Sequence, residues 1–411
     1  ILSGRKLGSM ILGSENIIST IVGYIFIILS LSVIVNILIS FHINNILYVR
    51  VFILMISLYG IFSIIALRAM MYNALKRAVC YYSDFSLFEK LTCIIILFNM
   101  LALLLNSFGP PTDADSLDYH LGIPLLWFRD LSAFPLDGWL HTRLVGLCEV
   151  INYIGLVCGT DILGQIIQYS GLWIIFISLL LLSKNKHILL FGLLVFCIPL
   201  NISLVTSQKP FLFPSAVMFY GFALFIHNIG NPEKKAFFIS IPCICYGIAC
   251  KYSFIISGSI LIIFIMITAI RNKSFKSLFI TCIISALIII APIYIRNYIY
   301  FGDPITPMLE YLKVYPNPLI IRFAESIKSY GGEINMYNVA ILPITLGITF
   351  DISLISTVLG IGTFSFFYTR LNNYKAKIML FLALAICGSV LLIGNISPRY
   401  YLDVYWLVLG S

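Results

Sequence analysis

Charged residues are scarce in this chain, and no segment has the composition of a soluble domain. Asp, Glu, Lys and Arg make up 10% of the 411 residues, against 60% hydrophobic residues, and the mean hydropathy is +1.02. Soluble globular domains carry about 25% charged residues. The net charge of +9 has no soluble face on which to build a nucleic-acid interface. The composition therefore predicts an integral membrane protein.

Metal-binding patterns are also missing. The ten cysteines include no Cys-x-x-Cys pair and no Cys/His ligand spacing, so we interpret most of them as small buried apolar side chains. Cys148 and Cys158 lie in or near one predicted external loop and could pair, although nothing in the pattern requires it. Four histidines stand isolated from one another along the chain: His42, His141, His187 and His227. The spacing excludes a histidine-rich metal site.

Apolar runs recur along the whole sequence. A helix needs roughly 20 apolar residues to cross a hydrocarbon core of about 30 Å, and we predict an all-α polytopic domain over 1–411 with about twelve such helices. They cover 17–39, 47–70, 91–108, 162–183, 187–206, 211–229, 236–250, 252–270, 277–296, 352–369, 377–395 and a run from 401. The run 17–39 predicts a retained helix, and residues 1–9 are interpreted as a remnant of truncation or cloning before Met10.

The charges predict the orientation. Short basic loops alternate with the others, as the positive-inside rule expects of the cytoplasm. They contain Arg5, Lys6, Arg68, Lys76, Arg77, Lys90, Lys184, Lys186, Lys234, Lys235, Arg271, Lys273, Lys276, Arg370, Lys375 and Lys377. We therefore predict that the two long loops, 109–161 and 297–351, face outward. The apolar segments LGIPLLWFRDL and RLVGLCEVINYIGLV predict amphipathic helices that lie in the interface and roof a cavity.

The stretch PPTDADSLDYHL, residues 110–121, opens the first long loop. Asp113, Asp115 and Asp118 are either solvated loop residues and caps of a helix that starts at about Ser116, or part of a site. Four cations stand on the same predicted side, at the outer ends of spans: Lys209, Lys251, Arg296 and Arg399. Each one alone is typical of a snorkelling anchor. Together with the acidic loop they favour a polar site at the outer surface.

An acid and several cations near the headgroup level suit transfer from a lipid phosphate. A carboxylate can take the proton of an acceptor hydroxyl as it attacks a sugar carbon, while Arg and Lys stabilise the charge on the departing phosphate. No cofactor follows from the pattern. Asp113, Asp115 and His120 are the one set that could bind a divalent cation, but the fuller ligand set of a metal site is missing.

At these residues the sequence resembles a known family. PPTDADSLDYHLGIPLLWF resembles the first external loop of bacterial GT-C superfamily glycosyltransferases, which are related to the dolichyl-phosphate-mannose and aminoarabinose transferases. An Asp-(Ser/Ala)-Leu-x-Tyr-His-Leu signature is filled by Asp115, Ser116, Leu117, Tyr119, His120 and Leu121. The segments IACKYSFIIS, IRNYIYFGDPITP and SPRYYLDVYW are similar to later parts of that family. Two spans precede the helix before the acidic loop, whereas the best-known relatives have none there.

The resemblance implies an inverting transferase in the bacterial cytoplasmic (inner) membrane. Its donor would be a sugar on polyprenyl phosphate, and its acceptor a glycan or lipid of the cell envelope, such as lipopolysaccharide or another polysaccharide, on the periplasmic side. Asp115 matches the general base, supported by Tyr119 and His120, with Asp113 and Asp118 as alternative second acids. The phosphate would be bound by Arg296, Lys251 and Arg399, with Lys209 as a fourth cation.

Two other functions remain open. A repeat-unit polymerase for O-antigen or capsule also has many spans and two large external loops, but it typically uses external arginines without a loop acid, so Asp115 discriminates. A flippase or transporter for lipid-linked glycans would place ionisable residues near mid-span and broken helices in two corresponding halves. The spans of this chain are nearly free of charge, which favours the transferase.

Overall fold

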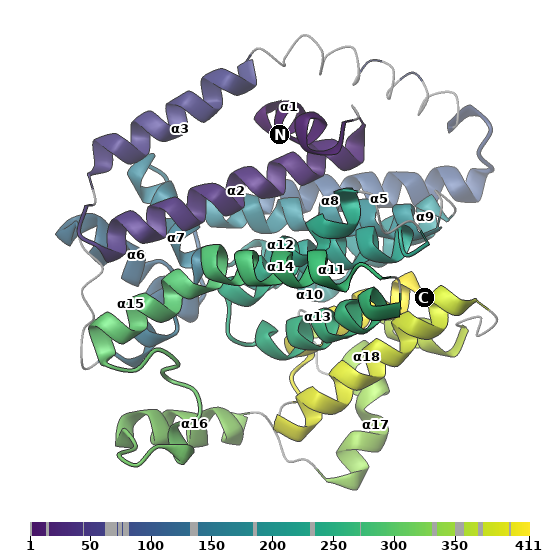
Figure 1. Cartoon of the computed structure of the whole chain (residues 1–411). Helices are drawn as coiled ribbons and strands as arrows, with labels where there is room; N and C mark the ends of the chain where they lie inside the picture. Colours follow the sequence, from purple (N-terminus) through teal and green to yellow (C-terminus); the bar gives the residue numbers. More distant parts are fainter. Residues whose placement is uncertain are drawn as a thin grey trace.

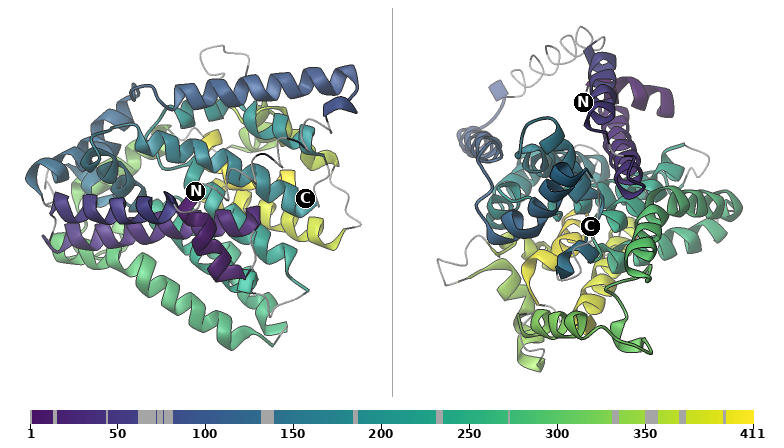
Figure 2. Two further views of the ribbon diagram at one scale, coloured as in Figure 1. Left: turned by 90° about the horizontal axis from the view of Figure 1, so that it is seen from above. Right: turned by 90° about the vertical axis from the view of Figure 1, so that its left-hand side faces the viewer.

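A computed structural model of the protein describes residues 2–13, 16–43, 45–61, 72, 76, 82–131, 139–183, 187–230, 235–271, 273–330, 335–349, 357–368, 373–393 and 396–411. Within these ranges the regular structure is helical and includes no strand. Helices α1 (Leu2–Leu12), α2 (Ile17–Ser40) and α3 (Ile46–Ile61) lie at one edge of the bundle (Figure 1). Helices α16 (Pro318–Tyr330) and α17 (Met336–Gly347) lie at the opposite edge (Figure 2).

Several helices have the length and composition of membrane spans. Six qualify in the described ranges: α2, α5 (Leu87–Asn106), α8 (Leu163–Ser183), α13 (Phe254–Arg271), the continuous run Phe275–Phe301 and α18 (Tyr374–Ile393). The run Phe275–Phe301 consists of α14 (Phe275–Ser285), a π-helical turn and α15 (Ala291–Phe301). Helices α9 (Ile188–Phe196) and α10 (Pro199–Val205) meet at 58° and would make a seventh, broken span. The protein is thus an all-helical, multi-pass membrane protein, as the composition predicts.

The other predicted spans correspond to shorter elements. Helices α3, α11 (Leu212–His227), α12 (Lys235–Cys250) and α19 (Leu402–Gly410) stand where spans are predicted, but each has fewer than 18 residues in the described part of the chain. The span predicted over 352–369 differs more. Residues 352–356 and 369 lie outside the described residues, and the remainder holds a 3-10 helix, Ile361–Tyr368, in place of an α-helix. Gly360 precedes it with φ +79°, a left-handed conformation that ends regular helix.

Helix α11 is the centre of the core. It is apolar on all sides and buried from Leu212 to Ile226, as expected of a helix surrounded by others. It packs against α8 and α12. At the edge of the bundle, α1 and α2 approach so closely that a Cβ on Gly23 would lie 1.8 Å from the carbonyl oxygen of Gly4. Small residues permit such contacts between helices in membranes.

A buried carboxylate joins three of the helices. Asp403 of α19 accepts hydrogen bonds from the hydroxyls of Ser215 on α11, at 2.5 Å, and Ser257 on α13, at 2.6 Å. A buried carboxylate needs such partners, because desolvation without hydrogen bonds is costly. Asp403 lies within the segment SPRYYLDVYW, but nothing in the sequence marks it as a link between helices.

The segments between spans contain further helices. LGIPLLWFRDL forms α6 (Gly122–Asp130), and RLVGLCEVINYIGLV forms α7 (Leu147–Val157), so the helices predicted for the first long loop are present. Helix α7 is not exposed on one face as an amphipathic helix would be: it is buried over Leu147–Gly155 and packs against α2, α8 and α12. Its only charged residue is Glu149, so almost every face can be buried. Residues 132–138, 331–334 and 350–351 of the long loops lie outside the described residues.

Candidate active site

One cavity of about 410 Å³ collects most of the residues that the sequence singles out. This volume lies within the range of small-molecule sites, roughly 300–1,000 Å³. Its walls come from the turn before α6, from α7 and α16, and from the segments that precede α11, α13 and α19. Six of the predicted site residues line it: Asp115, Tyr119, His120, Lys209, Lys251 and Arg399. The cavity therefore joins segments that are almost 300 positions apart in sequence.

The acidic stretch reaches the cavity through a π-helical turn, Ser116–His120, where the sequence predicts an ordinary first helical turn. Its start is fixed by Ser116, whose buried hydroxyl accepts a hydrogen bond of 2.8 Å from the backbone N–H of Gln208. The N–H of Ser116 donates to Asp113 Oδ1 at 3.1 Å. π-helical turns often occur at functional sites. This one directs Asp115, Tyr119 and His120 to the same cavity.

Lys209 holds the two acids that precede the turn. Its Nζ lies 2.9 Å from Asp113 Oδ1 and 3.0 Å from Asp115 Oδ2. Burial raises the pKa of Asp113, but hydrogen bonds from Ser116 and Lys209 and the positive charge of Lys209 outweigh it, so its pKa lies below the ordinary value. Asp115 lines the cavity, whereas Asp113 and the exposed Asp118 do not. Of the three acids, only Asp115 faces the space a substrate would fill.

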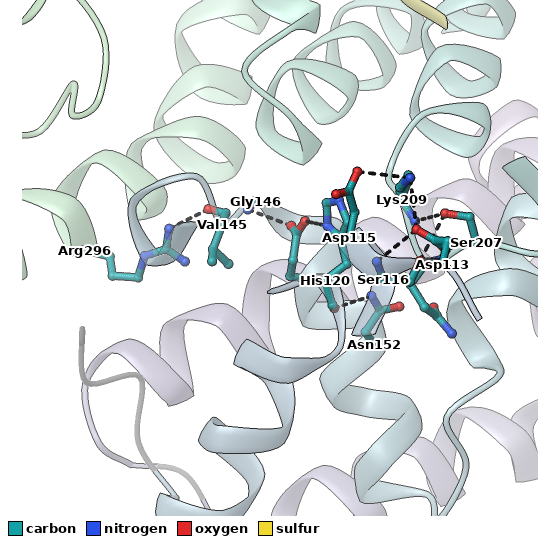
Figure 3. Close-up of polar contacts among 12 residues, drawn as sticks. Asp113, Asp115, Ser116, His120, Val145, Gly146, Asn152, Ser207, Lys209 and Arg296 are labelled. Carbon is teal, nitrogen blue, oxygen red and sulfur yellow. Dashed lines mark hydrogen bonds and ion pairs between the residues drawn. The ribbon is translucent and has the colours of Figure 1, made fainter. Parts of the chain in front are cut away.

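His120 forms a buried pair with Glu149 of α7. His120 Nδ1 lies 2.7 Å from Glu149 Oε1, and Glu149 Oε2 accepts the N–H of Gly146 at 2.8 Å (Figure 3). Asn152 donates to the carbonyl oxygen of His120 at 2.7 Å. Burial lowers the pKa of His120 below its ordinary value, although the Glu149 carboxylate opposes this. The sequence shows Glu149 only as one more acid of the loop. A glutamate three residues after Gly146, at a helix start, is nevertheless a capping signal.

An aromatic wall faces these residues. Tyr119 stacks on His141 with ring centroids 4.2 Å apart and an angle of 9° between planes. The edge of His141 in turn meets Phe323 of α16, with centroids 5.4 Å apart. Burial lowers the pKa of His141. His141 stands apart from the other histidines in the sequence, and folding brings it beside Tyr119, which is 22 positions away.

Two cations occupy another wall around one aromatic ring. Lys251 Nζ lies 3.6 Å from the ring centroid of Phe211, and the Arg399 guanidinium lies 5.5 Å from the same centroid. Burial and the positive charge of Arg399 lower the pKa of Lys251 to about 7. In the described part of the chain, neither cation has a carboxylate within 4 Å. Their charge is therefore available to an anionic ligand.

The fourth predicted cation, Arg296 of α15, does not line this cavity. Its side chain is buried, and Nη2 donates to the carbonyl oxygen of Val145 at 2.6 Å. Nη1 lies 3.3 Å from Asn36 Oδ1. Figure 3 shows Arg296 at one end of the polar cluster and Lys209 at the other. The structure thus places Arg296 where it supports Val145 and Gly146, the residues that precede α7.

Replacement of Arg296 by alanine is expected to affect the stability of the protein more than binding of an anionic ligand in the cavity. The change leaves the Val145 carbonyl without its buried partner, and we expect the melting temperature in detergent to fall by roughly 5 °C or more. Folded Arg296→Ala protein should keep its affinity for an anionic ligand of the cavity within about threefold, whereas Arg399→Ala should weaken that affinity at least about tenfold. An equal loss of affinity in both variants would show that Arg296 contacts the ligand. Arg296→Lys, which keeps the charge, is the matched control.

The acidic and histidine side chains are engaged with other residues, not gathered as metal ligands. No group of three or more His, Cys, Asp or Glu side chains takes a metal-binding arrangement in the described ranges. Asp113 and Asp115 both contact Lys209, and His120 contacts Glu149. The residues Asp113, Asp115 and His120 thus belong to two separate units, an ion pair with Lys209 and a hydrogen bond with Glu149.

Comparison with known proteins identifies a family. No curated protein and no solved structure matches the chain. Residues 8–411 match the family described as the DUF1420 N-terminal domain. That match extends over nearly the whole chain, including every residue of the cavity. The protein therefore belongs to the DUF1420 N-terminal domain family.

Proposed function

We propose that this protein is an inverting membrane glycosyltransferase that moves a sugar from a polyprenyl-phosphate donor to a glycan or lipid acceptor. One observation carries the proposal: a single cavity holds Asp115 together with Lys251 and Arg399, two cations that lack an acidic partner among the described residues. An acid suits activation of a hydroxyl, and unpaired cations suit a phosphate. The sequence resemblance to GT-C glycosyltransferases points to the same chemistry.

Asp115 is the general base in this proposal. It removes the proton from an acceptor hydroxyl, whose oxygen forms a bond to the anomeric carbon while the bond from that carbon to the phosphate oxygen breaks. The phosphate leaves with an added negative charge, which Lys251 and Arg399 stabilise. Lys209, which contacts one oxygen of Asp115, orients the carboxylate and leaves its other oxygen free for the acceptor. Tyr119 supplies part of the aromatic wall beside the base.

The membrane arrangement belongs to the same proposal. The cavity would open on the periplasmic side of the bacterial inner membrane, with the basic loops on the cytoplasmic side. About twelve crossings would then include the shorter apolar helices as well as the six long ones. A donor whose lipid chain lies in the bilayer could present its phosphate at the level of Lys251 and Arg399. In this chemistry the cations of the chain provide the charge stabilisation.

The proposed function is tested by purified protein in lipid nanodiscs. Undecaprenyl-phosphate sugars with a radiolabelled hexose or pentose are supplied together with lipid extract from the cell envelope as acceptor. We expect label to move to a new lipid or glycan, and the same product to be missing, by mass, from cells that lack the gene. Use of a lipid-linked oligosaccharide in place of a monosaccharide donor would indicate a polymerase. Lipid flux across vesicles without any transfer would indicate a flippase.

A further inference from the structure

The pair His120 and Glu149 leaves one ring nitrogen without a partner. His120 is only 2% exposed, and its Nδ1 is engaged by Glu149 at 2.7 Å. Its Nε2 is buried and has no hydrogen-bond partner among the described residues. Buried polar atoms are almost always hydrogen-bonded, so an unpaired buried nitrogen needs a physical explanation. The ring lines the cavity beside Asp115 and Lys251, which indicates that a ligand supplies the missing partner.

Glu149 determines which kind of ligand group fits. Both of its oxygens accept hydrogen bonds, one from His120 and one from the backbone N–H of Gly146. A carboxylate cannot donate, so the proton of a neutral imidazole lies on Nδ1. Nε2 then has a lone pair and no hydrogen. It can accept a hydrogen bond from a hydroxyl, but it has nothing to offer a phosphate oxygen, which is itself an acceptor.

Neighbouring residues fix the position of His120. Asn152 binds the carbonyl oxygen of His120, and the ring of Tyr119 packs against the imidazole with centroids 4.1 Å apart. Glu149 is fixed at the first turn of the buried helix α7. Rotation of the imidazole would break its hydrogen bond to Glu149 and its packing against Tyr119. The burial that lowers the pKa of His120 also favours its neutral form at neutral pH.

We propose that His120 Nε2, held as an acceptor by Glu149, binds a hydroxyl group of the substrate. The cavity is then divided into two subsites: cations Lys251 and Arg399 take the anionic group, and His120 takes a hydroxyl of the sugar next to Asp115. This inference rests on the proposed function for the identity of the ligand as a lipid-phosphate sugar. It assigns His120 as a specificity-determining contact and Glu149 as a positioning residue.

The test compares two ligands on the same protein. Affinity is measured in nanodiscs for undecaprenyl phosphate and for the same lipid carrying glucose, galactose or arabinose, tried one at a time. We expect wild type to prefer at least one sugar-bearing lipid. His120→Phe, which keeps a ring but has no acceptor, should lower the affinity for that lipid by about tenfold, the usual effect of one hydrogen bond. Binding of bare undecaprenyl phosphate should change less than about twofold. A purely structural defect would lower the affinity for both lipids by the same factor.

Two further variants sharpen the test. His120→Gln returns an amide oxygen near the position of Nε2 and should recover part of the preference. Glu149→Gln has one acceptor oxygen where two are needed, so its NH₂ group faces either the N–H of Gly146 or the His120 ring. When the NH₂ group faces His120, Nδ1 has to accept, the imidazole proton moves to Nε2, and the preference for the sugar-bearing lipid falls. An equal loss for both lipids in His120→Phe, or no loss for either, would overturn the inference, as would a wild-type protein without sugar preference.

The outcomes also separate this inference from the proposed function. Sugar preference that depends on His120, with no transfer to any acceptor, would uphold the hydroxyl subsite and contradict the transferase. Sugar transfer by the wild type, together with an unchanged ratio of the two affinities in His120→Phe, would uphold the transferase and contradict the hydroxyl subsite. Failure of wild type to bind either lipid would count against both.

Discussion

Asp115→Asn protein is expected to transfer sugar at least about 10²-fold more slowly than wild type, the usual contribution of a general base. Asparagine has the shape of aspartate and can still accept from Lys209 through its oxygen, so the 3.0 Å contact between Lys209 and residue 115 can be kept. It cannot take up the acceptor proton. The rate is measured with saturating labelled donor in nanodiscs, and the melting temperature is measured on the same sample.

Asp118→Asn is the matched control for this variant. Asp118 lies three residues further along the same stretch, is exposed and does not line the cavity. The same chemical change there should leave the rate within about twofold of wild type. Asp115→Asn protein that is folded and retains most of its activity would remove Asp115 as the base. Equal losses in both variants would point to a general effect of acidic charge in the loop.

Most of the residues that line the cavity could be predicted from the sequence, because charged residues in an apolar chain are confined to the ends of the apolar runs. Asp115, Lys209, Lys251 and Arg399 each stand at the end of an apolar run or beside one, so the ends of the helices bring them to one surface. The helical class and the multi-pass membrane character follow from the apolar runs themselves. These features depend on composition and on positions close together in sequence, which one sequence reveals directly.

The partners of these residues could not be predicted in the same way. Arg296 is held by Val145, 151 positions away, and its burial depends on how α2, α7 and α15 pack. An arginine near a predicted helix end looks the same in sequence whether it faces a ligand or a carbonyl group. The role of Glu149 likewise depends on the π-helical turn that brings His120 against it. Contacts of this kind arise from tertiary packing and have no local signal.

The second large effect expected is a pH dependence of donor binding. Burial and the charge of Arg399 lower the pKa of free Lys251 to about 7, so the side chain is charged below that pH and neutral above it. A phosphate favours the charged form and raises the pKa of Lys251 in the complex. Affinity for a sugar-bearing undecaprenyl phosphate should therefore be highest at pH 6 and fall by up to about tenfold per unit as pH rises above 7. A phosphodiester keeps one negative charge throughout, so the ligand does not contribute.

Lys251→Arg separates this effect from other groups that titrate in the cavity. Arginine stays charged between pH 6 and pH 8, so the variant should bind the lipid about equally well at both pH values. Its guanidinium group has to fit beside Phe211. Lys251→Met should bind weakly at both pH values. His120 and His141 also line the cavity, and a pH dependence that persists in Lys251→Arg would be assigned to them. A flat profile in wild type would mean that Lys251 does not meet the phosphate, leaving Arg399 as the cation that does.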